Sequence, residues 1–260
     1  MILFKNTSVF HEKELQENKR LQVAFEAADS ASKAKTEFLN RMSHDIRTPI
    51  NGIMGMLEII RKNREDHERV DDCLEKIQVS SRHLLALVND VLDMSKLEAG
   101  QASFEAVDFD ISQLMRDVSY LVKAQILDME LTHRAHRENI QHTLLLGYPL
   151  QLRQILLNLF SNAIKYNKKG GFIDTTAKEV SFDGETVIYE FSITDTGIGM
   201  SESFVKNQLF EPFTQEKSDA RTQYKGTGLG MSIVKKLIQQ MSGTIQVESK
   251  LGKGTTFTFR

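Results

Sequence analysis

The feature that most constrains the fold of this chain is a long apolar seam in its first hundred residues. Between about residues 12 and 62 the sequence has one proline, Pro49, and two glycines, Gly52 and Gly55. Apolar or small side chains recur there in steps of four and three, a spacing typical of a coiled-coil helix. The seam comprises Leu21, Phe25, Ala28, Ser32, Leu39, Met42, Ile46, Ile50, Ile53, Leu57 and Ile60, with Lys35 as a charged exception.

A second helical pattern runs from about residue 66 to 98. Its apolar positions are Val70, Cys73, Ile77, Ser81, Leu84, Val88, Val91 and Met94. The polar stretch "RKNREDHE" separates the two patterns, so we expect an antiparallel helical hairpin. One hairpin buries its own apolar stripe poorly, and dimerisation into a four-helix bundle is the natural solution.

After residue 100 the pattern changes to mixed helices and strands. The stretch "PLQLRQILLNLFSNAIKYN" predicts a helix with Pro149 in its first turn. Residues Val187, Tyr189, Phe191 and Ile193 alternate as on one face of a strand. "MSIVKKLIQQMSG" predicts a helix that stops near Gly243, and "GTIQVESKLGKGTTFTFR" a closing hairpin. The fold class is therefore α plus α/β, with a helical hairpin followed by an α/β sandwich.

Composition excludes several functions. The 33 basic and 35 acidic side chains give a net charge of −2, so we expect no binding to nucleic acid or to an anionic membrane. The single cysteine, Cys73, excludes an internal disulfide and fits a reducing compartment. No apolar run is long enough to span a bilayer, and the apolar stretch at the N-terminus is too short for a signal peptide.

Two glycine clusters suggest a phosphate-facing site. They are "DTGIG", with Asp195, Gly197 and Gly199, and "GTGLG", with Gly226, Gly228 and Gly230, which runs directly into a helix. Glycines let a backbone approach a ligand closely, and a helix N-terminus offers free N–H groups to phosphate. Either cluster alone would be read as a turn, and "GTGLG" lacks the preceding strand and third spaced glycine of a dinucleotide site.

A third element strengthens the nucleotide interpretation. Asn158 and Asn162 lie four apart, on one face of the helix that contains "NLFSNAIK". An amide oxygen from this pair suits magnesium, which takes few protein ligands beside phosphate and water. Asp195, at the end of a strand, suits an exocyclic amine.

The first helix holds an unusual group of residues, His44, Asp45 and Pro49. A proline inside a helix costs about 3 kcal/mol and removes the donor for a carbonyl, here that of Asp45. His44 falls two residues beyond Met42 and two before Ile46 in the seam, so it points outward. An outward histidine taken alone is usually just solvated. Neighbouring residues on a helix do not face each other, so spacing alone predicts no contact between His44 and Asp45.

These motifs together resemble the sensor histidine kinases of two-component signalling. "SHDIRTP" resembles the family's phosphoacceptor motif, "NLFSNAIKY" its asparagine motif, "DTGIG" and "GTGLG" its glycine motifs, and "FEPF" the short motif between them. Their order and spacing match over roughly residues 30–260. The resemblance implies a dimeric hairpin that carries the histidine and an ATP-binding domain of the gyrase, Hsp90, histidine kinase and MutL type. The implied domains are a coiled-coil signalling helix (1–29), a dimerisation and phosphotransfer domain (30–104) and a catalytic ATP-binding domain (105–260).

The resemblance also implies roles for individual residues. His44 would receive the γ-phosphoryl group of ATP, Asp45 would act as its base or orienting group, and Thr48 would orient a water for dephosphorylating a partner. Asn162 would bind Mg²⁺ with help from Asn158. Residues Phe210 through Lys225 would form a mobile lid. The remaining implied nucleotide-binding residues are Lys165, Tyr166, Asp195, Gly197, Gly199, Phe213, Arg221, Lys225, Gly226, Thr227, Gly228, Leu229 and Gly230.

Partners and location follow from the same resemblance. We expect a cytoplasmic homodimer, or the cytoplasmic part of a membrane-bound sensor, without direct membrane contact in this fragment. An upstream sensor domain would lie outside the chain. The phosphoryl group would pass to an aspartate of a response-regulator receiver domain, either separate or fused beyond Arg260.

Two rival functions remain. An ATP-hydrolysing clamp would share the ATP-binding fold, but such enzymes carry a glutamate base at the position of Asn158, and an amide cannot take a proton. A pseudokinase would bind nucleotide or only dimerise, although every motif residue here is chemically competent. His133, His136 and His142 in "HRAHRENIQH" follow no zinc spacing, and we expect them in a solvated, partly basic loop.

Overall fold

The computed structural model describes residues 2–100, 104–216 and 227–260. Within the first helix it describes side chains at 14–22, 25 and 40, and from residue 42 onward. The chain divides into two compact units, Met1–Leu85 and Ala86–Arg260.

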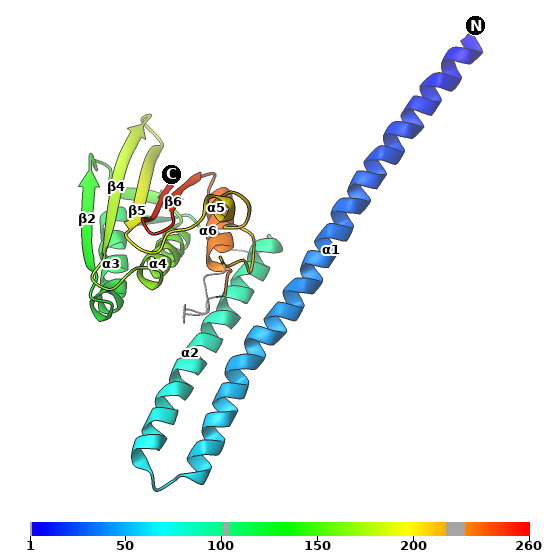
Figure 1. Cartoon of the computed structure of the whole chain (residues 1–260). Helices are drawn as coiled ribbons and strands as arrows, with labels where there is room; N and C mark the ends of the chain where they lie inside the picture. Colours follow the sequence, from blue (N-terminus) through cyan, green and yellow to red (C-terminus); the bar gives the residue numbers. More distant parts are fainter. Residues whose placement is uncertain (1, 101–103, 217–226) are drawn as a thin grey trace. The chain divides into compact units, whose positions relative to one another are not determined.

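The first unit is a helical hairpin, as predicted. Helix α1 (Ile2–Lys62) and the larger part of helix α2 (His67–Glu98) run antiparallel (Figure 1). The backbone and side-chain amides of Asn63 both donate to the Ile59 carbonyl, at 3.0 and 2.8 Å, and close the end of α1. Asp66 accepts a hydrogen bond of 3.1 Å from the Arg69 amide, which caps the start of α2.

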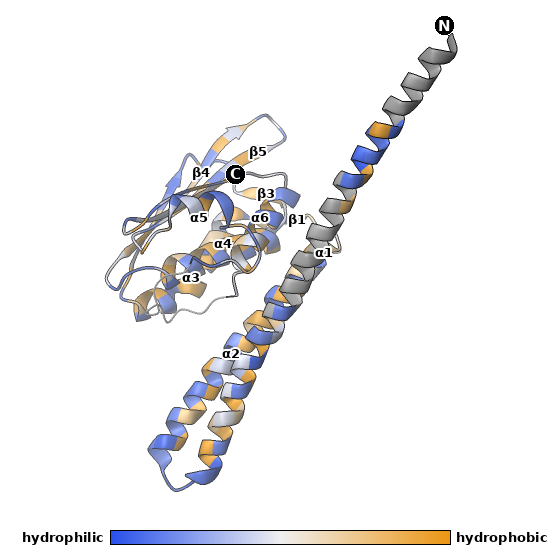
Figure 2. Ribbon diagram, turned by 45° about the vertical axis from the view of Figure 1, so that its right-hand side comes forward, coloured by the Kyte–Doolittle hydropathy of each residue, from blue (hydrophilic) through white to orange (hydrophobic). Residues whose placement is uncertain are grey.

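Apolar residues recur along both helices of the hairpin (Figure 2). Their burial divides them into two stripes on each helix, which the sequence pattern did not separate. The buried or half-buried stripe includes Met42, Ile46, Pro49, Ile53, Met56 and Ile60 in α1, and Val70, Cys73, Ile77, Ser80 and Leu84 in α2. The exposed stripe includes Ile50, Met54 and Leu57 in α1, and Leu74, Ser81 and Leu85 in α2.

The predicted seam joins residues of both stripes. Six of its described members are exposed in the single chain, namely Leu21, Phe25, Ile50, Leu57, Ser81 and Val88. The physical reason is that steps of three and four also connect neighbouring stripes on one helix, so spacing alone does not separate them. Two adjacent apolar stripes are typical of a helix that contacts two other helices.

The second unit is an α/β sandwich, as predicted. Its five-stranded sheet has the order β2-β4-β5-β7-β6, with β2 and β4 parallel and the other pairs antiparallel. Strands β1 and β3 form a separate small sheet. The elements are β1 (Val107–Asp110), α3 (Ile111–Asp128), β2 (Thr132–Glu138), β3 (Leu144–Gly147), α4 (Pro149–Lys165), β4 (Phe172–Phe182), β5 (Val187–Asp195), α5 (Glu202–Asn207), α6 (Gly230–Gln240), β6 (Ile245–Lys250) and β7 (Gly254–Phe259).

The core lies between the sheet and the helices α3, α4 and α6 (Figure 1). Tyr189, Phe191 and Ile193 alternate into this core from β5, as the sequence predicted. Helix α4 begins at Pro149, and α6 ends at Gln240. Three residues later, the Gly243 amide donates to the Ile238 carbonyl at 2.8 Å. The expected closing hairpin is the antiparallel pair of β6 and β7.

The last turns of α2 belong to this second core. Met94 and Leu97 are buried in the same apolar cluster as the residues of α4 and α6, and Val91 packs against it. The end of α2 thus packs as part of the second unit, although it continues the hairpin helix in sequence.

The histidine-rich segment is not the solvated loop that the sequence analysis expected. His133 and His136 lie in the edge strand β2, and His142 follows it. His133 packs edge-on to Phe160, and burial lowers the pKa of its imidazole. His142 Nδ1 lies 2.7 Å from Glu179 Oε1. The prediction of a loop was wrong because the residues that contact this segment lie in α4 and β4, far from it in the sequence.

Glu179 is the buried charge that fixes the loop after β2. Its carboxylate accepts hydrogen bonds from the backbone amides of His142, at 3.0 Å, and Gln141, at 2.7 Å. These hydrogen bonds lower the pKa of Glu179 to about 2. The described residues contain no group of three or more His, Cys, Asp or Glu side chains that could hold a metal ion.

Candidate active site

His44 lies in α1 with its side chain 79% exposed. Its Nδ1 atom is 3.2 Å from Asp45 Oδ1, a contact that helical spacing did not predict. The Thr48 hydroxyl, one turn further along, donates to the His44 carbonyl oxygen at 3.0 Å. With Asp45 at Nδ1, the Nε2 atom is the ring nitrogen available for chemistry.

Pro49 lies inside a helix that continues on both sides of it. Pro49 is buried in the buried or half-buried stripe of α1, and the helix continues to Lys62. Pro49 has no N–H to donate to the Asp45 carbonyl, and a bend of the helix at Asp45 is a prediction from that missing bond.

The two asparagines of α4 face the start of α6. A methyl group placed at Gly230 would lie 3.7 Å from Asn158 Oδ1. The Asn162 side-chain amide donates to Met231 Sδ at 3.2 Å. The two amides therefore share a face, as their spacing predicted, and that face meets the helix end that follows "GTGLG".

Asp195 ends strand β5 and is almost fully buried. Burial raises the pKa of its carboxyl group to about 6, against the opposing effect of backbone N–H groups of Gly197 and Thr255. The Gly197 amide donates to Asp195 Oδ1 at 2.8 Å. A side chain at Gly197 would overlap the Tyr166 carbonyl, so the turn after β5 packs tightly on the end of α4.

Lys165 and Tyr166 stand at that same end of α4. The Lys165 ammonium donates to the Tyr166 hydroxyl at 3.0 Å and lies 4.7 Å from the centre of its ring. The Tyr166 carbonyl accepts the Ile198 amide at 3.0 Å. One positive charge is thus held beside the turn that begins at Asp195.

Two supporting residues escaped the sequence analysis. The Thr196 hydroxyl donates to Asn167 Oδ1 at 3.1 Å and accepts the Phe172 amide at 2.9 Å. The Asn167 side-chain amide donates to the Phe172 carbonyl at 3.1 Å. Only their positions in the sequence could have indicated them, because Asn167 directly follows Tyr166 and Thr196 directly follows Asp195.

The glycines of the two clusters differ in backbone conformation and in how closely they pack. Gly228 has φ of +70° and Phe213 has φ of +63°, and the Phe213 amide donates to the Gly228 carbonyl at 2.9 Å. This hydrogen bond joins the start of the predicted lid segment to the loop before α6, and residues 217–225 of that segment lie outside the described residues. Gly199, with φ of +64°, packs where a side chain would overlap the carbonyl of Lys250, the last residue of β6. A side chain at Gly230 would instead make ordinary contact with the Asn158 amide.

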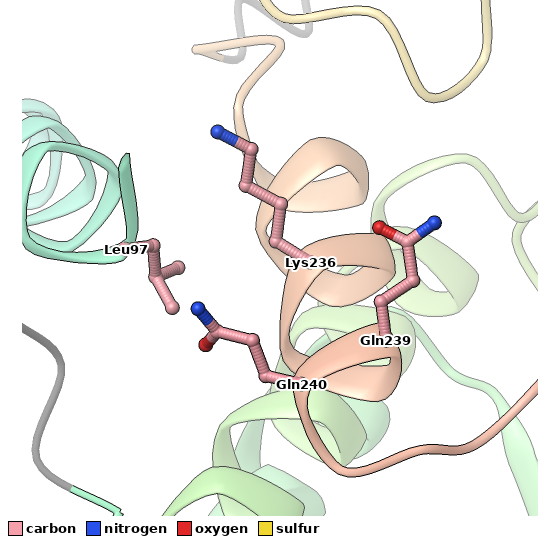
Figure 3. A pocket seen from close by; sticks show the side chains of 4 residues that line it. All are labelled: Leu97, Lys236, Gln239 and Gln240. Carbon is pink, nitrogen blue, oxygen red and sulfur yellow. The ribbon is translucent and has the colours of Figure 1, made fainter. Parts of the chain in front are cut away.

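Three predicted residues, Arg221, Lys225 and Gly226, lie outside the described residues. The other predicted nucleotide-binding residues form one neighbourhood, in which α4 meets the turn after β5 on one side and the start of α6 on the other. A hollow of about 550 Å³ lies elsewhere in the unit, lined by Leu97, Lys236, Gln239 and Gln240. Figure 3 shows Leu97 and Gln240 facing each other across it. None of its lining residues belongs to the predicted site.

Comparison with protein families agrees with this arrangement. Residues 34–100 match the His Kinase A (phospho-acceptor) domain, and residues 147–260 match the histidine kinase-, DNA gyrase B- and HSP90-like ATPase. The chain belongs to the sensor histidine kinases.

Individual relatives of this histidine kinase show the same likeness. It is 39% identical over 243 residues to the sensor histidine kinase GacS of Pseudomonas protegens, covering 93% of this chain and 26% of GacS. The chain spans about a quarter of the length of the curated relatives it matches first. Among the described residues, no helix is both long and apolar enough to cross a membrane.

Two solved structures share the fold. Full-length ShkA in complex with AMPPNP is 32% identical with a TM-score of 0.61, covering 86% of this chain and 45% of ShkA. ThkA in complex with the response regulator protein TrrA has a TM-score of 0.64 and covers 86% of this chain and 60% of ThkA. At 23% identity, the likeness to ThkA concerns the fold alone.

Proposed function

We propose that this chain is the kinase core of a sensor histidine kinase, which transfers the γ-phosphoryl group of Mg-ATP to His44. The observation that carries the proposal is the exposed imidazole of His44 with Asp45 at its Nδ1 atom. The reaction would take place in the cytoplasm, where ATP and magnesium are supplied.

The geometry at His44 suggests the course of the transfer. A neutral imidazole that donates its Nδ1 hydrogen to Asp45 leaves a lone pair on Nε2. Nε2 attacks the γ-phosphorus, the P–N bond forms, and the bond to the bridging oxygen of ADP breaks. Asp45 holds the ring in this tautomer and stabilises the positive charge that develops on it.

The second unit would hold the nucleotide. Asp195 would accept a hydrogen bond from the adenine amine, and Lys165 would contact phosphate. Gly230 begins α6, where the free N–H groups of a helix N-terminus suit phosphate. Gly199, Gly228 and Phe213 would shape the site through the backbone contacts described above. Catalysis would be mostly positioning and charge neutralisation.

The amides of α4 fit a magnesium ion that also contacts phosphate. Asn162 gives its N–H to Met231, which leaves its side-chain oxygen to face another ligand, and Asn158 flanks the same turn of α6. Mg²⁺ commonly uses one or two protein ligands and completes its shell with phosphate and water. When bound, the ion would neutralise charge on the phosphates.

The side-chain amide of Asn158 argues against an ATP-hydrolysing clamp. At Asn158 an enzyme that activates water needs a proton acceptor, and an amide is not one.

Incubation with ATP labelled on the γ-phosphate or on the α-phosphate distinguishes the kinase, the ATPase and the pseudokinase. We expect only the γ-label to become attached to protein, lost in acid and stable in alkali as phosphohistidine is. Phosphate release without label would revive the ATPase, and nucleotide binding without either would favour a pseudokinase.

The exposed stripe of the hairpin supports a homodimer. Leu57 is 44% and Leu85 is 62% exposed in a single chain, in line with other apolar residues at helical spacing. A contiguous apolar stripe of this kind on a hairpin marks an interface, and two hairpins would complete a four-helix bundle.

Charge in this stripe tests the dimer. We expect Leu85→Glu to weaken dimerisation by more than about tenfold, because a carboxylate would have to be buried in the bundle. The control is Leu144→Glu, at an 80% exposed leucine in the other unit, which should leave the dimer intact. Analytical ultracentrifugation over a concentration series measures both, and an unchanged dimer in Leu85→Glu would contradict the proposed interface.

The acceptor of the phosphoryl group would be an aspartate of a receiver domain, and the solved structure of ThkA contains a response regulator. Thr48 would orient a water that hydrolyses the aspartyl phosphate of the partner, which releases inorganic phosphate. Adding a purified receiver to the labelled kinase should move label from an alkali-stable to an alkali-labile linkage. Retention of all label on the kinase with every receiver of the source organism would count against this step.

A further inference from the structure

The end of α2 touches the loop that leads into α6. The Thr227 hydroxyl donates a hydrogen bond of 2.8 Å to Asp90 Oδ2. Both residues belong to the second unit and are partly buried at this contact. They are 137 positions apart in sequence, so only the folded unit brings them together.

The bond to Asp90 engages the Thr227 hydroxyl, which we expect to contact the phosphates of a bound nucleotide. Thr227 lies in "GTGLG", directly before the α6 N-terminus. Its hydroxyl oxygen accepts the Leu229 amide at 3.1 Å, and its single hydrogen is given to Asp90. A hydroxyl has one hydrogen to donate, so Thr227 cannot donate to Asp90 and to a phosphate oxygen at the same time.

The charge of Asp90 works in the same direction. The N-terminus of a helix carries a partial positive charge that attracts phosphate. A carboxylate beside the start of α6 offsets this attraction. ATP brings several negative charges to this loop, and a carboxylate in hydrogen-bond contact with it disfavours them.

We propose that Asp90 is an autoinhibitory side chain, which holds Thr227 of the nucleotide loop and lowers the affinity of the kinase for polyphosphates. The inference rests on the proposed function, because it assumes that the loop binds the phosphates of ATP. Nucleotide phosphate and Asp90 compete for Thr227, so tight binding requires the end of α2 to release the loop.

A second polar contact links α2 to the core helices. Asp93, one turn further on, accepts a hydrogen bond of 2.7 Å from the Gln154 side chain in α4, away from the nucleotide loop. Met94 and Leu97, on the same helix, are both buried, and Leu97 also lines the hollow shown in Figure 3. The contact of Asp90 with Thr227 is therefore distinct from the contact of Asp93 with α4.

Asp90→Asn tests the inference, with Asp93→Asn as the matched control. The two variants make the same change three residues apart on one helix, and only the first touches Thr227. The titrants are AMPPNP with magnesium, which carries three phosphates and resists hydrolysis, and adenosine, which carries none. Thermal denaturation of each variant confirms that it is folded.

We expect Asp90→Asn to bind AMPPNP roughly two- to tenfold more tightly than the unchanged protein, the range of a partly exposed polar interaction. Adenosine affinity should be the same in both, and Asp93→Asn should behave as the unchanged protein does. Equal or weaker AMPPNP binding by Asp90→Asn would overturn the autoinhibitory role. An equal gain for adenosine would overturn it too, since the phosphates would then not be involved. Failure of the unchanged protein to bind AMPPNP would instead overturn the proposed function.

Discussion

Replacing His44 by glutamine is expected to abolish covalent labelling by γ-labelled ATP while leaving nucleotide affinity unchanged. Glutamine is polar and helix-compatible, so the exposed surface of α1 tolerates it, but its amide nitrogen is not a nucleophile. The proposed nucleotide-binding residues lie in the second unit. Loss of label should therefore be complete rather than partial.

The matched control is His67→Gln. His67 is an exposed histidine at the start of α2 in the same hairpin, outside the phosphoacceptor motif. We expect this variant to take up label at the rate of the unchanged protein. Labelling is followed on denaturing gels, and nucleotide affinity by titration with AMPPNP. Residual label in His44→Gln, or its loss in His67→Gln, would contradict the assignment of His44.

Replacing Asp195 by asparagine is expected to weaken AMPPNP binding by about ten- to a hundredfold. The proposed hydrogen bond from the adenine amine ends on a carboxylate, and such charged hydrogen bonds contribute roughly 1.5–3 kcal/mol. The control is Asp174→Asn, which removes a carboxylate from the opposite face of the neighbouring strand β4. Affinity of the control should match that of the unchanged protein, and equal affinity in Asp195→Asn would contradict the adenine contact.

Asp195 also gives the nucleotide site a pH dependence. Burial raises the pKa of this carboxyl group to about 6, from an ordinary value of 3.8. As the pH falls through 6 the group takes up a proton and loses its charge, so AMPPNP affinity should fall. Asp195→Asn should bind weakly at every pH and lack this change between pH 7.5 and 5.

The same shift predicts a stability effect of the opposite sign. Because the folded-state pKa is raised, the charged carboxylate destabilises the fold above pH 6, and this cost disappears as the pH falls toward 3.8. A shift of about two units corresponds to at most about 3 kcal/mol. Without nucleotide, Asp195→Asn should therefore be more stable than the unchanged protein at pH 7.5, as measured by urea unfolding. Lower stability at that pH would show that the buried charge is compensated.

Local patterns in the sequence predict much of this fold and site. The helices at 67–98, 149–165 and 230–240 and the alternation through β5 follow from hydrophobic period, Pro149 and Gly243. Asn158 and Asn162 share a face because four residues make about one helical turn. Short-range periodicity carries this information wherever one face of an element is buried.

Contacts between distant segments escape such patterns. The Thr227 bond to Asp90 and the Glu179 bond to His142 join positions far apart in the chain, and no local spacing encodes them. The contact of Asp45 with His44 depends on side-chain rotamers, which helical spacing does not determine. The two stripes of the hairpin merged into one for a related reason, because a single helix does not reveal how many neighbours it has.

The most direct test of the account is to locate the phosphoryl group on the labelled chain by NMR, with ³¹P coupling to the protons of the imidazole ring. We expect one phosphorylated residue, His44, with phosphorus on Nε2, because Asp45 lies at Nδ1. Phosphorylation at another residue, or at Nδ1 of His44, would contradict the proposed chemistry of this site.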